Sequence, residues 1–490
     1  MSSLELKKKQ AAQASVEATA EASLYAPARK IYPQKVHGTF RRIKWALLLI
    51  TLGIYYVLPF VRWSRGPHEP TQAVLVDLAH HRFYFFFIEL WPQEVYYFTG
   101  LLILAALILF LMNAVAGRMW CGYLCPQTVW TDLFMAVERF IEGDRRERMH
   151  RDAGPFTAER AMRKLAKHTV WIVIAWWTGG AWVLYFADTP TLVKELATFT
   201  APMTAYGAIG VLTFTTYVLA GHMREQVCLY MCPWPRIQAA LTDENALNVT
   251  YRYDRGEPRI SVKRAAVLRA AGERAGDCID CDQCVAVCPT GVDIRDGANL
   301  GCIQCGLCID ACDTVMRKIG RPERLIAYDT DVNIERRLKG LTPVIRIVRA
   351  RTLLYATVIA IVGGVMLYAL VGRSHYGLAV IHDRNPLYVR LSDGSIRNAY
   401  TVRFVNKDAE EREFSLAVSG LAAASVDIVG NDGDGPRRLT VAVGPDQTRE
   451  VRVLVSAKAG VSGGSLPLSF TALADNGATS VSATDYFRTP

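Results

Sequence analysis

The chain has 490 residues, more than a single hydrophobic core usually serves, so we expect several domains. Hydrophobic residues make up 51% of the sequence and the formal net charge is +10, a combination that favours a membrane protein with basic loops over a nucleic-acid-binding protein. The sequence contains no P-loop, no GxGxxG after a predicted strand and no CxxCH, so no motif indicates a bound nucleotide or covalent c-type haem.

Residues 1–40 are predicted to be a disordered tail, because the segment starts Lys-rich and continues with the low-complexity run AAQASVEATAEAS. The apolar stretch that follows is not expected to be a cleaved signal peptide. A long polar segment precedes it, and no small-residue cleavage site comes after it.

Apolar stretches of the length needed to cross a bilayer, about 20 residues, recur five times and predict an α-helical transmembrane bundle of about five spans. Buried core helices are the alternative, but a soluble fold seldom needs helices that are apolar on all faces. The predicted spans are Trp45–Trp63, Tyr97–Ala116, Thr169–Ala187, Ala205–Gly221 and Leu353–Val371. The shorter aromatic segment His80–Pro92 is predicted to be interfacial or re-entrant.

Lysine and arginine predict the orientation of these spans. They are dense ahead of the first span and in the loop after the second, whereas the loop from Asp188 to Met203 carries only Lys194. By the positive-inside rule the N-terminus and both basic loops face the cytoplasm. An odd number of spans then places everything after Val371 on the opposite side.

Two matched cysteine pairs, each followed by proline, stand at the predicted cytoplasmic ends of spans: CGYLCP with Cys121 and Cys125, and CLYMCP with Cys228 and Cys232. The i, i+4 spacing places both sulfurs on one helix face, and the proline favours the first turn of a new helix, where a thiol pKa is lowered. Four soft thiolates suit Cu(I), zinc or another cluster, with Met231 and His222 as further candidate ligands. Alternatively, these cysteines pack as small hydrophobic residues.

The other eight cysteines form two C-x2-C-x2-C-x3-C runs, CIDCDQCVAVC and CIQCGLCIDAC, a pattern typical of a ferredoxin that holds two 4Fe–4S clusters. In this pattern the fourth cysteine of each run binds the other cluster. Disulfides do not suit a segment on the cytoplasmic side, and zinc sites have no use for a third cysteine in each run. The predicted sets are Cys278, Cys281, Cys284 and Cys312 for the first cluster, and Cys302, Cys305, Cys308 and Cys288 for the second.

The last part of the chain is predicted to be an immunoglobulin-like β-sandwich. Alternating runs such as RNAYTVRFVNK and REVRVLVSA are separated by turn signals such as Ser392-Asp393-Gly394. This segment contains no cysteine, so the usual disulfide between the sheets is absent. The stretch NDGDG at 431–435 favours a hairpin turn over a calcium loop.

Together these features predict five regions along the chain. They are the tail (1–40), a transmembrane region with four spans and both CxxxCP motifs (41–250), a cytoplasmic ferredoxin-like domain (251–345), a fifth span (346–373) and the β-sandwich (374–490).

In their combination and order, the twin CxxxCP motifs, the double ferredoxin motif and the tail beginning IHDRNPLYVRLSDGSIRNAYTVRFVNK resemble the family of cytochrome oxidase accessory proteins called CcoG, FixG or RdxA. The resemblance covers almost the whole chain beyond the N-terminal tail. One departure from the simplest ferredoxin pattern is visible: Pro289 follows Cys288, but Asp313 follows Cys312. This difference removes no ligand, but it leaves the environment of that cluster open.

The resemblance implies a multi-pass protein of a bacterial inner membrane, with a cytoplasmic N-terminus, two 4Fe–4S clusters and a periplasmic immunoglobulin-like domain. It implies a role in the assembly of cbb3-type cytochrome c oxidase, with reduction of Cu(II) to Cu(I) as the activity. The implied partners are oxidase subunits or copper chaperones and a cytosolic electron donor.

Two other functions are compatible with the same motifs. One is a membrane ferredoxin that exchanges electrons with quinol and a partner reductase, although such a conduit has no obvious use for an external β-domain. The other is a non-enzymatic copper-handling or assembly scaffold whose clusters are structural.

Overall fold

The computed structural model describes residues 30–66, 69–408, 410–421, 424–429, 439–458, 460–461, 463–474 and 479–490. The chain divides into two compact units, Met1–Val61 with Gln72–Ile361, and Arg62–Thr71 with Val362–Pro490. The predicted tail up to residue 29 and the NDGDG stretch lie outside the described residues.

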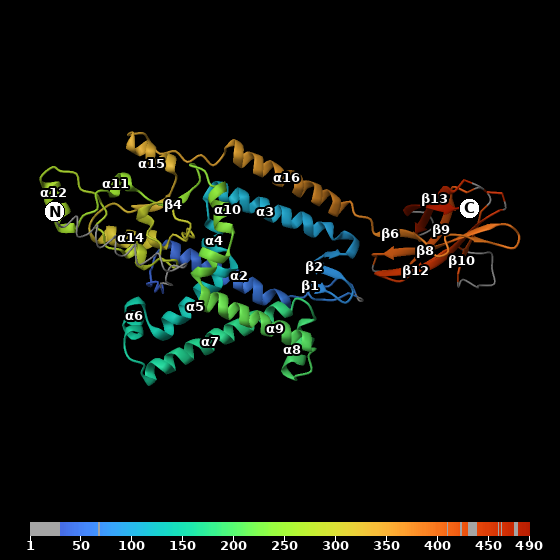
Figure 1. Ribbon diagram of the computed structural model, residues 1–490, viewed down its shortest axis with the longest axis horizontal. Coiled ribbons are helices and arrows are strands. Elements are labelled where there is room, and N and C mark those ends of the chain that lie inside the picture. The colour runs from blue at the N-terminus through green and yellow to red at the C-terminus, as the bar shows by residue number, and fades with distance from the viewer. Residues whose placement is uncertain are drawn as a thin grey trace, which may run out of the picture. The chain divides into compact units, whose positions relative to one another are not determined.

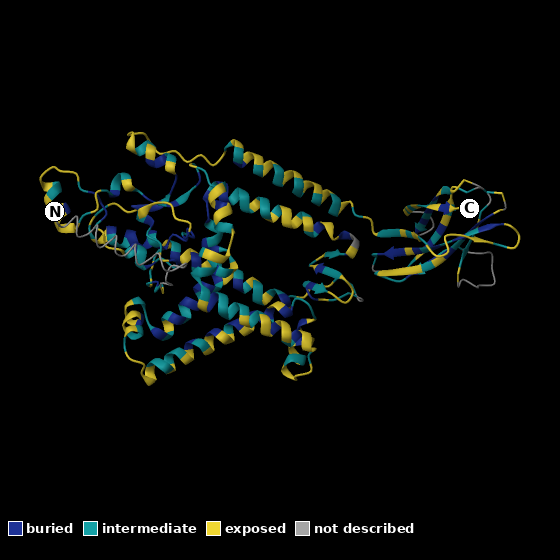
Figure 2. Ribbon diagram, viewed as in Figure 1, coloured by how far each residue is buried: buried dark blue, intermediate teal, exposed yellow. Residues whose placement is uncertain are grey.

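Among the described residues, four helical segments are long and apolar enough to cross a membrane. Apolar side chains along them are exposed (Figure 2), as with Leu102, which is 71% exposed, because lipid rather than protein would surround them. The four segments are α2 (Thr39–Val57) with η1 (Leu58–Phe60), α3 (Tyr96–Ala116), α9 (Met203–Thr216) with the π-helix η3 (Tyr217–Met223), and α16 (Ala350–Val371).

The predicted third span is not among these four segments. Its residues belong to α7 (Ala158–Val183), which packs along α9 (Figure 1). The apolar part of α7 is rich in tryptophan and follows Lys164, Lys167 and His168 directly, which lowers its hydropathy. The structure thus gives four spans by this criterion instead of five. The outward position of the C-terminal domain, which needs an odd number, stays a prediction.

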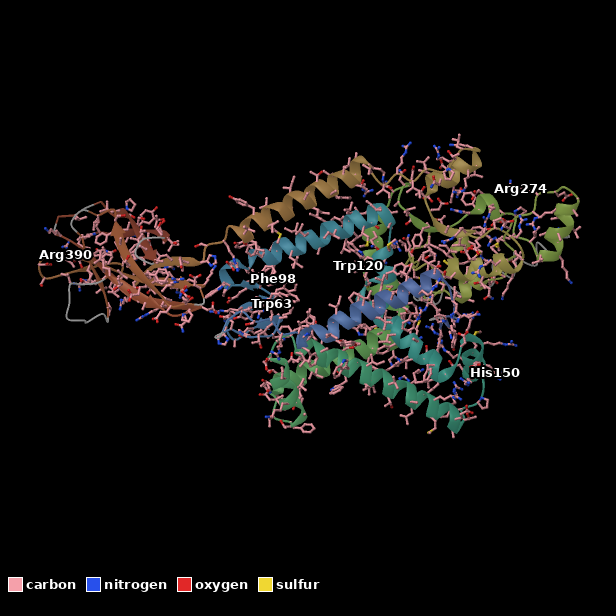
Figure 3. The ribbon with its side chains drawn as sticks, turned by 180° about the vertical axis from the view of Figure 1, so that it is seen from behind. Trp63, Phe98, Trp120, His150, Arg274 and Arg390 are labelled. Atoms are coloured by element: carbon pink, nitrogen blue, oxygen red, sulfur yellow. The ribbon has the colours of Figure 1, made fainter. Side chains whose placement is uncertain are left out.

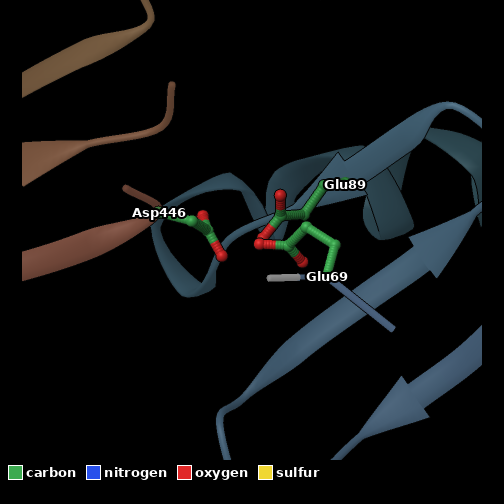
Figure 4. A group of neighbouring side chains, drawn as sticks. All are labelled: Glu69, Glu89 and Asp446. Atoms are coloured by element: carbon green, nitrogen blue, oxygen red, sulfur yellow. The ribbon is translucent and has the colours of Figure 1, made fainter. Parts of the chain in front are cut away.

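The segment predicted to be interfacial or re-entrant belongs to a small antiparallel sheet of β1 (Val74–Asp77), β2 (Arg82–Phe85) and β3 (Ile88–Leu90). Glu89, labelled in Figure 4, lies on β3 and accepts a hydrogen bond from Arg82 at 3.1 Å. Phe83 packs on Phe98 near the start of α3 (Figure 3), with ring centroids 4.5 Å apart. Paired strands therefore replace the re-entrant alternative.

Shorter helices connect the long ones. Pro126 is the first residue of α5, as expected for a proline at a helix start, and Pro233 caps α10. These helices are η2 (Pro92–Glu94), α4 (Met119–Tyr123), α5 (Pro126–Glu142), α6 (Arg145–Ala153), α8 (Thr189–Ala197), the π-helix η4 (Val227–Met231) and α10 (Trp234–Leu241).

Residues 30–38 lie against this unit without regular secondary structure. The backbone N–H of Gln34 donates to the carbonyl of Ala286 at 2.9 Å, and the Tyr32 hydroxyl donates to Asp152 at 2.8 Å. Because α2 begins at Thr39, the predicted tail extends too far: its part from residue 30 onward belongs to the folded unit.

The ferredoxin-like region starts and ends in a two-stranded antiparallel sheet, β4 (Asn248–Tyr251) with β5 (Ile326–Asp329), in which Asn248 lies opposite Asp329. Its start is therefore slightly earlier than residue 251. Ile309, Met316 and Leu325 are fully buried in its core. Its helices, with α15 after β5, are α11 (Tyr253–Gly256), α12 (Val262–Ala270), α13 (Gln283–Ala286), η5 (Ile294–Asp296), α14 (Leu307–Lys318) and α15 (Asp331–Leu338).

The second unit contains the predicted β-sandwich, and every alternating run of the sequence forms a strand. One antiparallel sheet has the order β10-β12-β8-β6, with β7 also paired to β8, and the other has the order β11-β9-β13-β14. Tyr400, Phe404, Phe414, Phe470 and Phe487 fill the core between them. The strands are β6 (Tyr376–His382), β7 (Val389–Arg390), β8 (Ile396–Asn406), β9 (Arg412–Ser419), β10 (Ser425–Ile428), β11 (Thr440–Val443), β12 (Gln447–Ala457), β13 (Ser465–Ala474) and β14 (Thr479–Arg488).

Candidate metal centres

The eight cysteines of the ferredoxin runs line two small cavities of nearly equal size. The structure combines them crosswise, as the spacing predicts. Cys284 borders both cavities, so the two lie next to each other. The first cavity is lined by Cys278, Cys281, Cys284 and Cys312, and the second by Cys302, Cys305, Cys308 and Cys288.

Each run turns sharply around its three clustered cysteines. Asp280 and Asp282 in the first run, and Gln304 and Gly306 at the matching places in the second, all have φ between 53° and 72°. This left-handed conformation suits glycine and, to a lesser degree, aspartate. In the first run Arg295 holds the turn, donating to Asp280 at 2.7 Å and to Asp282 at 2.6 Å.

Most of the thiols around the two cavities are buried or partly buried, and Cys281 is exposed. Burial raises the pKa of Cys284 and of Cys302 to about 12, and that of Cys308 well above its usual range. Buried thiolates are unfavourable without nearby positive charge, which the iron ions of a cluster supply. Four converging thiols around each cavity therefore fit a 4Fe–4S cluster.

The departure at Asp313 has a structural reason. Cys312 lies in the middle of α14, where a proline at the next position would remove a backbone hydrogen bond and break the helix. Asp313 is instead buried, and its carboxylate accepts the backbone N–H of Arg324 at 2.7 Å. Pro289, by contrast, comes after the short helix α13 has ended.

The structure brings the four CxxxCP cysteines together from two parts of the chain. Burial raises the pKa of Cys121 to about 12, and the thiols of Cys125, Cys228 and Cys232 all act on it. The pKa of Cys228 is raised in the same way, to about 11. For these two thiols, which precede the helix starts, burial and the neighbouring thiols both oppose ionisation.

The sulfur atoms of this thiol quartet (Cys121, Cys125, Cys228 and Cys232) are spaced too widely to surround a single metal ion. Among the described residues, no three cysteine sulfurs lie within 4.8 Å of one another. Four thiolates around a single tetrahedral ion would be about 3.8 Å apart, given a metal–sulfur bond of about 2.3 Å. The geometry thus suits a larger metal centre, or a single ion bound after the two segments move closer.

Both CxxxCP segments pack on the second ferredoxin run. A Cβ atom added to Gly122 would lie 2.8 Å from the Ile303 carbonyl oxygen and 3.0 Å from the Cys305 Cα, so only glycine allows this approach. Leu229 of the second motif lies against Gly301 in the same manner. Tyr123 donates its hydroxyl proton to the Cys305 carbonyl at 2.9 Å.

Arg118 precedes α4, the short helix that contains Trp120 (labelled in Figure 3) and Cys121, and it contacts several of these segments. Its guanidinium donates to the carbonyls of Leu300 at 2.5 Å and Pro235 at 2.8 Å, and its backbone N–H donates to Gln304 at 2.8 Å. It is buried and forms no ion pair with a described carboxylate. Sequence reasoning missed Arg118 and Gly122. For Gly122 the signal was that the first motif has glycine where the second has Leu229, one of two places at which the motifs differ.

The two additional ligand candidates are not joined to the quartet. His222 stacks on His168, with ring centroids 5.6 Å apart, and meets Trp171 and Tyr217 edge-on, in a cavity that no cysteine lines. Met231 is 56% exposed. The prediction of His222 as a ligand beside these thiols is therefore wrong for this structure.

Three family models match the chain. A "4Fe-4S dicluster domain" matches residues 223–331, which include the second CxxxCP motif and both ferredoxin runs. A "4Fe-4S binding domain" matches residues 98–142, which include Cys121 and Cys125. An "IG-like fold at C-terminal of FixG" matches residues 366–490.

Several known proteins are similar over most of their length. The nitrogen fixation protein FixG of Rhizobium meliloti is 51% identical over 464 residues, 89% of this chain and 88% of that protein. The protein RdxA of Cereibacter sphaeroides is 52% identical over 444 residues, 89% of this chain and 91% of that protein. The crystal structure of a FixG-related protein from Vibrio parahaemolyticus covers 24% of this chain and 97% of its own, at 20% identity and a TM-score of 0.20.

Proposed function

The chain belongs to the FixG/RdxA family of iron–sulfur proteins, and on that premise we propose that it acts in the assembly of a cbb3-type cytochrome oxidase by reducing Cu(II) to Cu(I). A cytosolic donor supplies one electron for each copper ion, and copper accepts it at the quartet of Cys121, Cys125, Cys228 and Cys232. Basic residues beside the first predicted span support a cytoplasmic N-terminus in a bacterial inner membrane, with the sandwich in the periplasm.

The residues that would hold the two clusters are the crosswise sets of the two cavities. When bound, the 4Fe–4S clusters supply one-electron carriers between the donor and the quartet. The chain keeps water away from the second set, because Cys305 is buried and Leu307 covers it. Arg118 places its positive charge beside Cys302 and Cys121.

The observation that carries this proposal is the packing of both CxxxCP segments on the second ferredoxin run. Gly122 lies against Cys305, and Leu229 lies against Gly301, with no other element between them. Thiols that only filled space would not need both motifs at the same cluster. This packing supports electron transfer from the second cluster to the thiol quartet.

The quartet also has the right chemistry for copper reduction. Cu(II) prefers nitrogen and oxygen ligands in a tetragonal arrangement, whereas Cu(I) prefers soft sulfur. A thiolate site therefore favours the reduced ion. Because the sulfurs are spaced openly, copper would draw the two CxxxCP segments together on binding.

A second candidate for the quartet is a further iron–sulfur cluster. Two observations favour it: the open spacing of the sulfurs, and the match of residues 98–142 to a 4Fe–4S binding domain. Iron analysis of anaerobically purified protein distinguishes the two. About eight irons per chain fit copper as the substrate of the quartet, and about twelve fit a third cluster.

Anaerobic reoxidation of the reduced, full-length protein tests the proposed activity. Cu(II) should reoxidise the clusters and appear as Cu(I) with a Cu(I)-specific chelator, and a quinone analogue should not. The quadruple variant C121S/C125S/C228S/C232S should keep its cluster absorbance and lose copper reduction. Reoxidation by quinone alone would instead establish the quinol conduit, and reoxidation by neither would establish the scaffold.

A further inference from the structure

A hollow of about 470 Å³, which the proposed function does not use, lies beside the second ferredoxin run. Val287 and Pro289, on either side of Cys288, form part of its wall, and so does Leu307, which precedes Cys308. The rest comes from α5 and Asp144 after it, and from the first turns of α2 with the segment that precedes them. The hollow therefore adjoins the second cluster site at the point where a candidate membrane span begins.

Positive charge dominates the lining of this hollow. Four cations, Lys35, Arg41, Arg42 and Arg139, face two carboxylates, Asp132 and Asp144. One carboxylate is already neutralised: both oxygens of Asp132 accept from Arg41, at 2.8 and 2.9 Å, and Lys44 lies 3.9 Å away. Asp144 accepts the backbone N–H of Lys35 at 2.9 Å.

The remaining cations outnumber the one carboxylate, Asp144, that Arg41 does not neutralise. Within the described residues, the side chains of Lys35, Arg42 and Arg139 form no ion pair. Burial lowers the pKa of Arg139; the charges of Asp132 and Asp144 oppose this shift, and those of Arg41 and Arg148 add to it. Because four cations share two carboxylates around one hollow, an excess of positive charge remains, and an anion between the cations would neutralise it.

Arg41 supplies an independent sign of a missing partner. Its side chain is 9% exposed, and its Nη2 atom is buried without a hydrogen-bond acceptor. Native proteins leave few buried polar groups unsatisfied, so such an atom points to an unseen acceptor. Arginine forks match the geometry of phosphate oxygens, which accept two parallel hydrogen bonds.

We propose that this hollow binds a phosphate-bearing anion, held by Arg41, Arg42, Arg139 and Lys35. Acidic phospholipid headgroups and free phosphate compounds share this chemistry. Apolar side chains at the rim, Trp45 and the 91% exposed Phe140, could lie along an acyl chain. Basic pockets at the ends of membrane helices are known to hold acidic headgroups.

Binding to full-length, cluster-loaded protein in a neutral detergent tests the proposal. The probes are dioctanoyl phosphatidylglycerol, zwitterionic dioctanoyl phosphatidylcholine and inorganic pyrophosphate. The R42Q/R139Q variant removes two unpaired cations and leaves the buried Arg41–Asp132 pair intact. R146Q is a matched control, since Arg146 is exposed on α6 outside the hollow. Unchanged cluster absorbance verifies the fold of each variant.

We expect R42Q/R139Q to bind at least one probe tenfold more weakly than the wild type, and R146Q to bind it normally. Selective binding of phosphatidylglycerol identifies a lipid headgroup, and binding of pyrophosphate identifies a soluble phosphate compound. If no probe binds, or if R42Q/R139Q binds as the wild type does, the proposal is overturned. Copper reduction is not part of this readout, so the two proposals fail separately.

Discussion

The two cluster cavities share one cysteine pattern but have opposite surroundings. Around the first, Cys281 is exposed, and the side chains of Asp280 and Asp282 are 60% and 68% exposed. Around the second, Cys305 is buried and both CxxxCP segments cover the run. The cysteine spacing therefore determines the ligands, while the neighbouring elements determine what each site contacts: solvent at the first, and the thiol quartet at the second.

The largest difference between the two cavities should appear in the free energy of unfolding when one carboxylate near each cavity is neutralised. D132N leaves Arg41 and Lys44 as buried cations without a counter-charge, and should lower the free energy of unfolding by about 3–5 kcal/mol. D282N removes an exposed partner of Arg295 and should lower it by less than about 1 kcal/mol. Denaturant unfolding in detergent measures both. Equal losses would show that the two sites are equally exposed.

The same pair has a predictable pH dependence. Although burial alone would raise it, Lys44 and Arg41 hold the pKa of Asp132 below its usual range. A lowered pKa contributes stability above the unfolded value of about 4, and this contribution is lost as the pH falls through the folded-state value. The difference between wild type and D132N should therefore shrink in acid, below about pH 4. A difference that stays constant there would contradict the assignment.

The contact between Gly122 and the second run should be the next most sensitive feature. G122A pushes a methyl group against Ile303 and Cys305 and should destabilise the protein by about 1–3 kcal/mol, with loss of iron from the second site. G180A is the matched control, because a Cβ atom at Gly180 meets nothing within 4 Å. Thermal unfolding and iron analysis report the result. Normal iron content in G122A would show that the motif does not press on the cluster site.

Arg118 should distinguish the clusters by potential. Removing its charge in R118M should lower the potential of the second cluster by roughly 60 mV, a tenfold change for one electron, and leave the first unchanged. R118K should restore part of the shift, because it keeps the charge. Redox titration followed by electron paramagnetic resonance resolves the two. A shift in both clusters would mean a general loss of structure.

The smallest effect is expected at the exposed rim of the first cavity. D280N/D282N removes two negative charges and should raise the potential of the first cluster by roughly 30 mV or less, because water and salt screen exposed charges. The shift should fade at high ionic strength. The same titration measures it, and a salt-independent shift would place these carboxylates in a drier site than the structure gives them.

The sequence predicted the features that depend on residues close together in the chain, such as cysteine spacing and strand alternation. The spacing of Cys278–Cys288 and Cys302–Cys312 was enough for the crosswise sets, because a cubane constrains its ligands more tightly than the rest of the fold does. The strands of the sandwich followed from alternation alone. Pro126 predicted the start of α5, because the fixed φ of proline suits a first helical turn.

Features that depend on docking escaped the sequence. Nothing near Gly122 shows that Cys305, far along the chain, will lie against it. His222 was expected beside the thiols because of its position in sequence, but the π-helix η3 carries it to His168 instead. The segment 80–92 resembled an interfacial element because its aromatic residues do not reveal strand pairing with residues 74–77.

The pairing of β4 with β5 has a consequence for how this architecture is built. Asn248 lies opposite Asp329, so the two ends of the segment that carries all eight ferredoxin cysteines are adjacent in space. An inserted domain of this kind can be gained, lost or exchanged without a change in the order of the surrounding helices, because its two ends are adjacent. A short hairpin that joins residues 248 and 329 should therefore keep the chain continuous when the inserted domain is removed. The inserted domain is thus a suitable unit for transfer into another membrane protein.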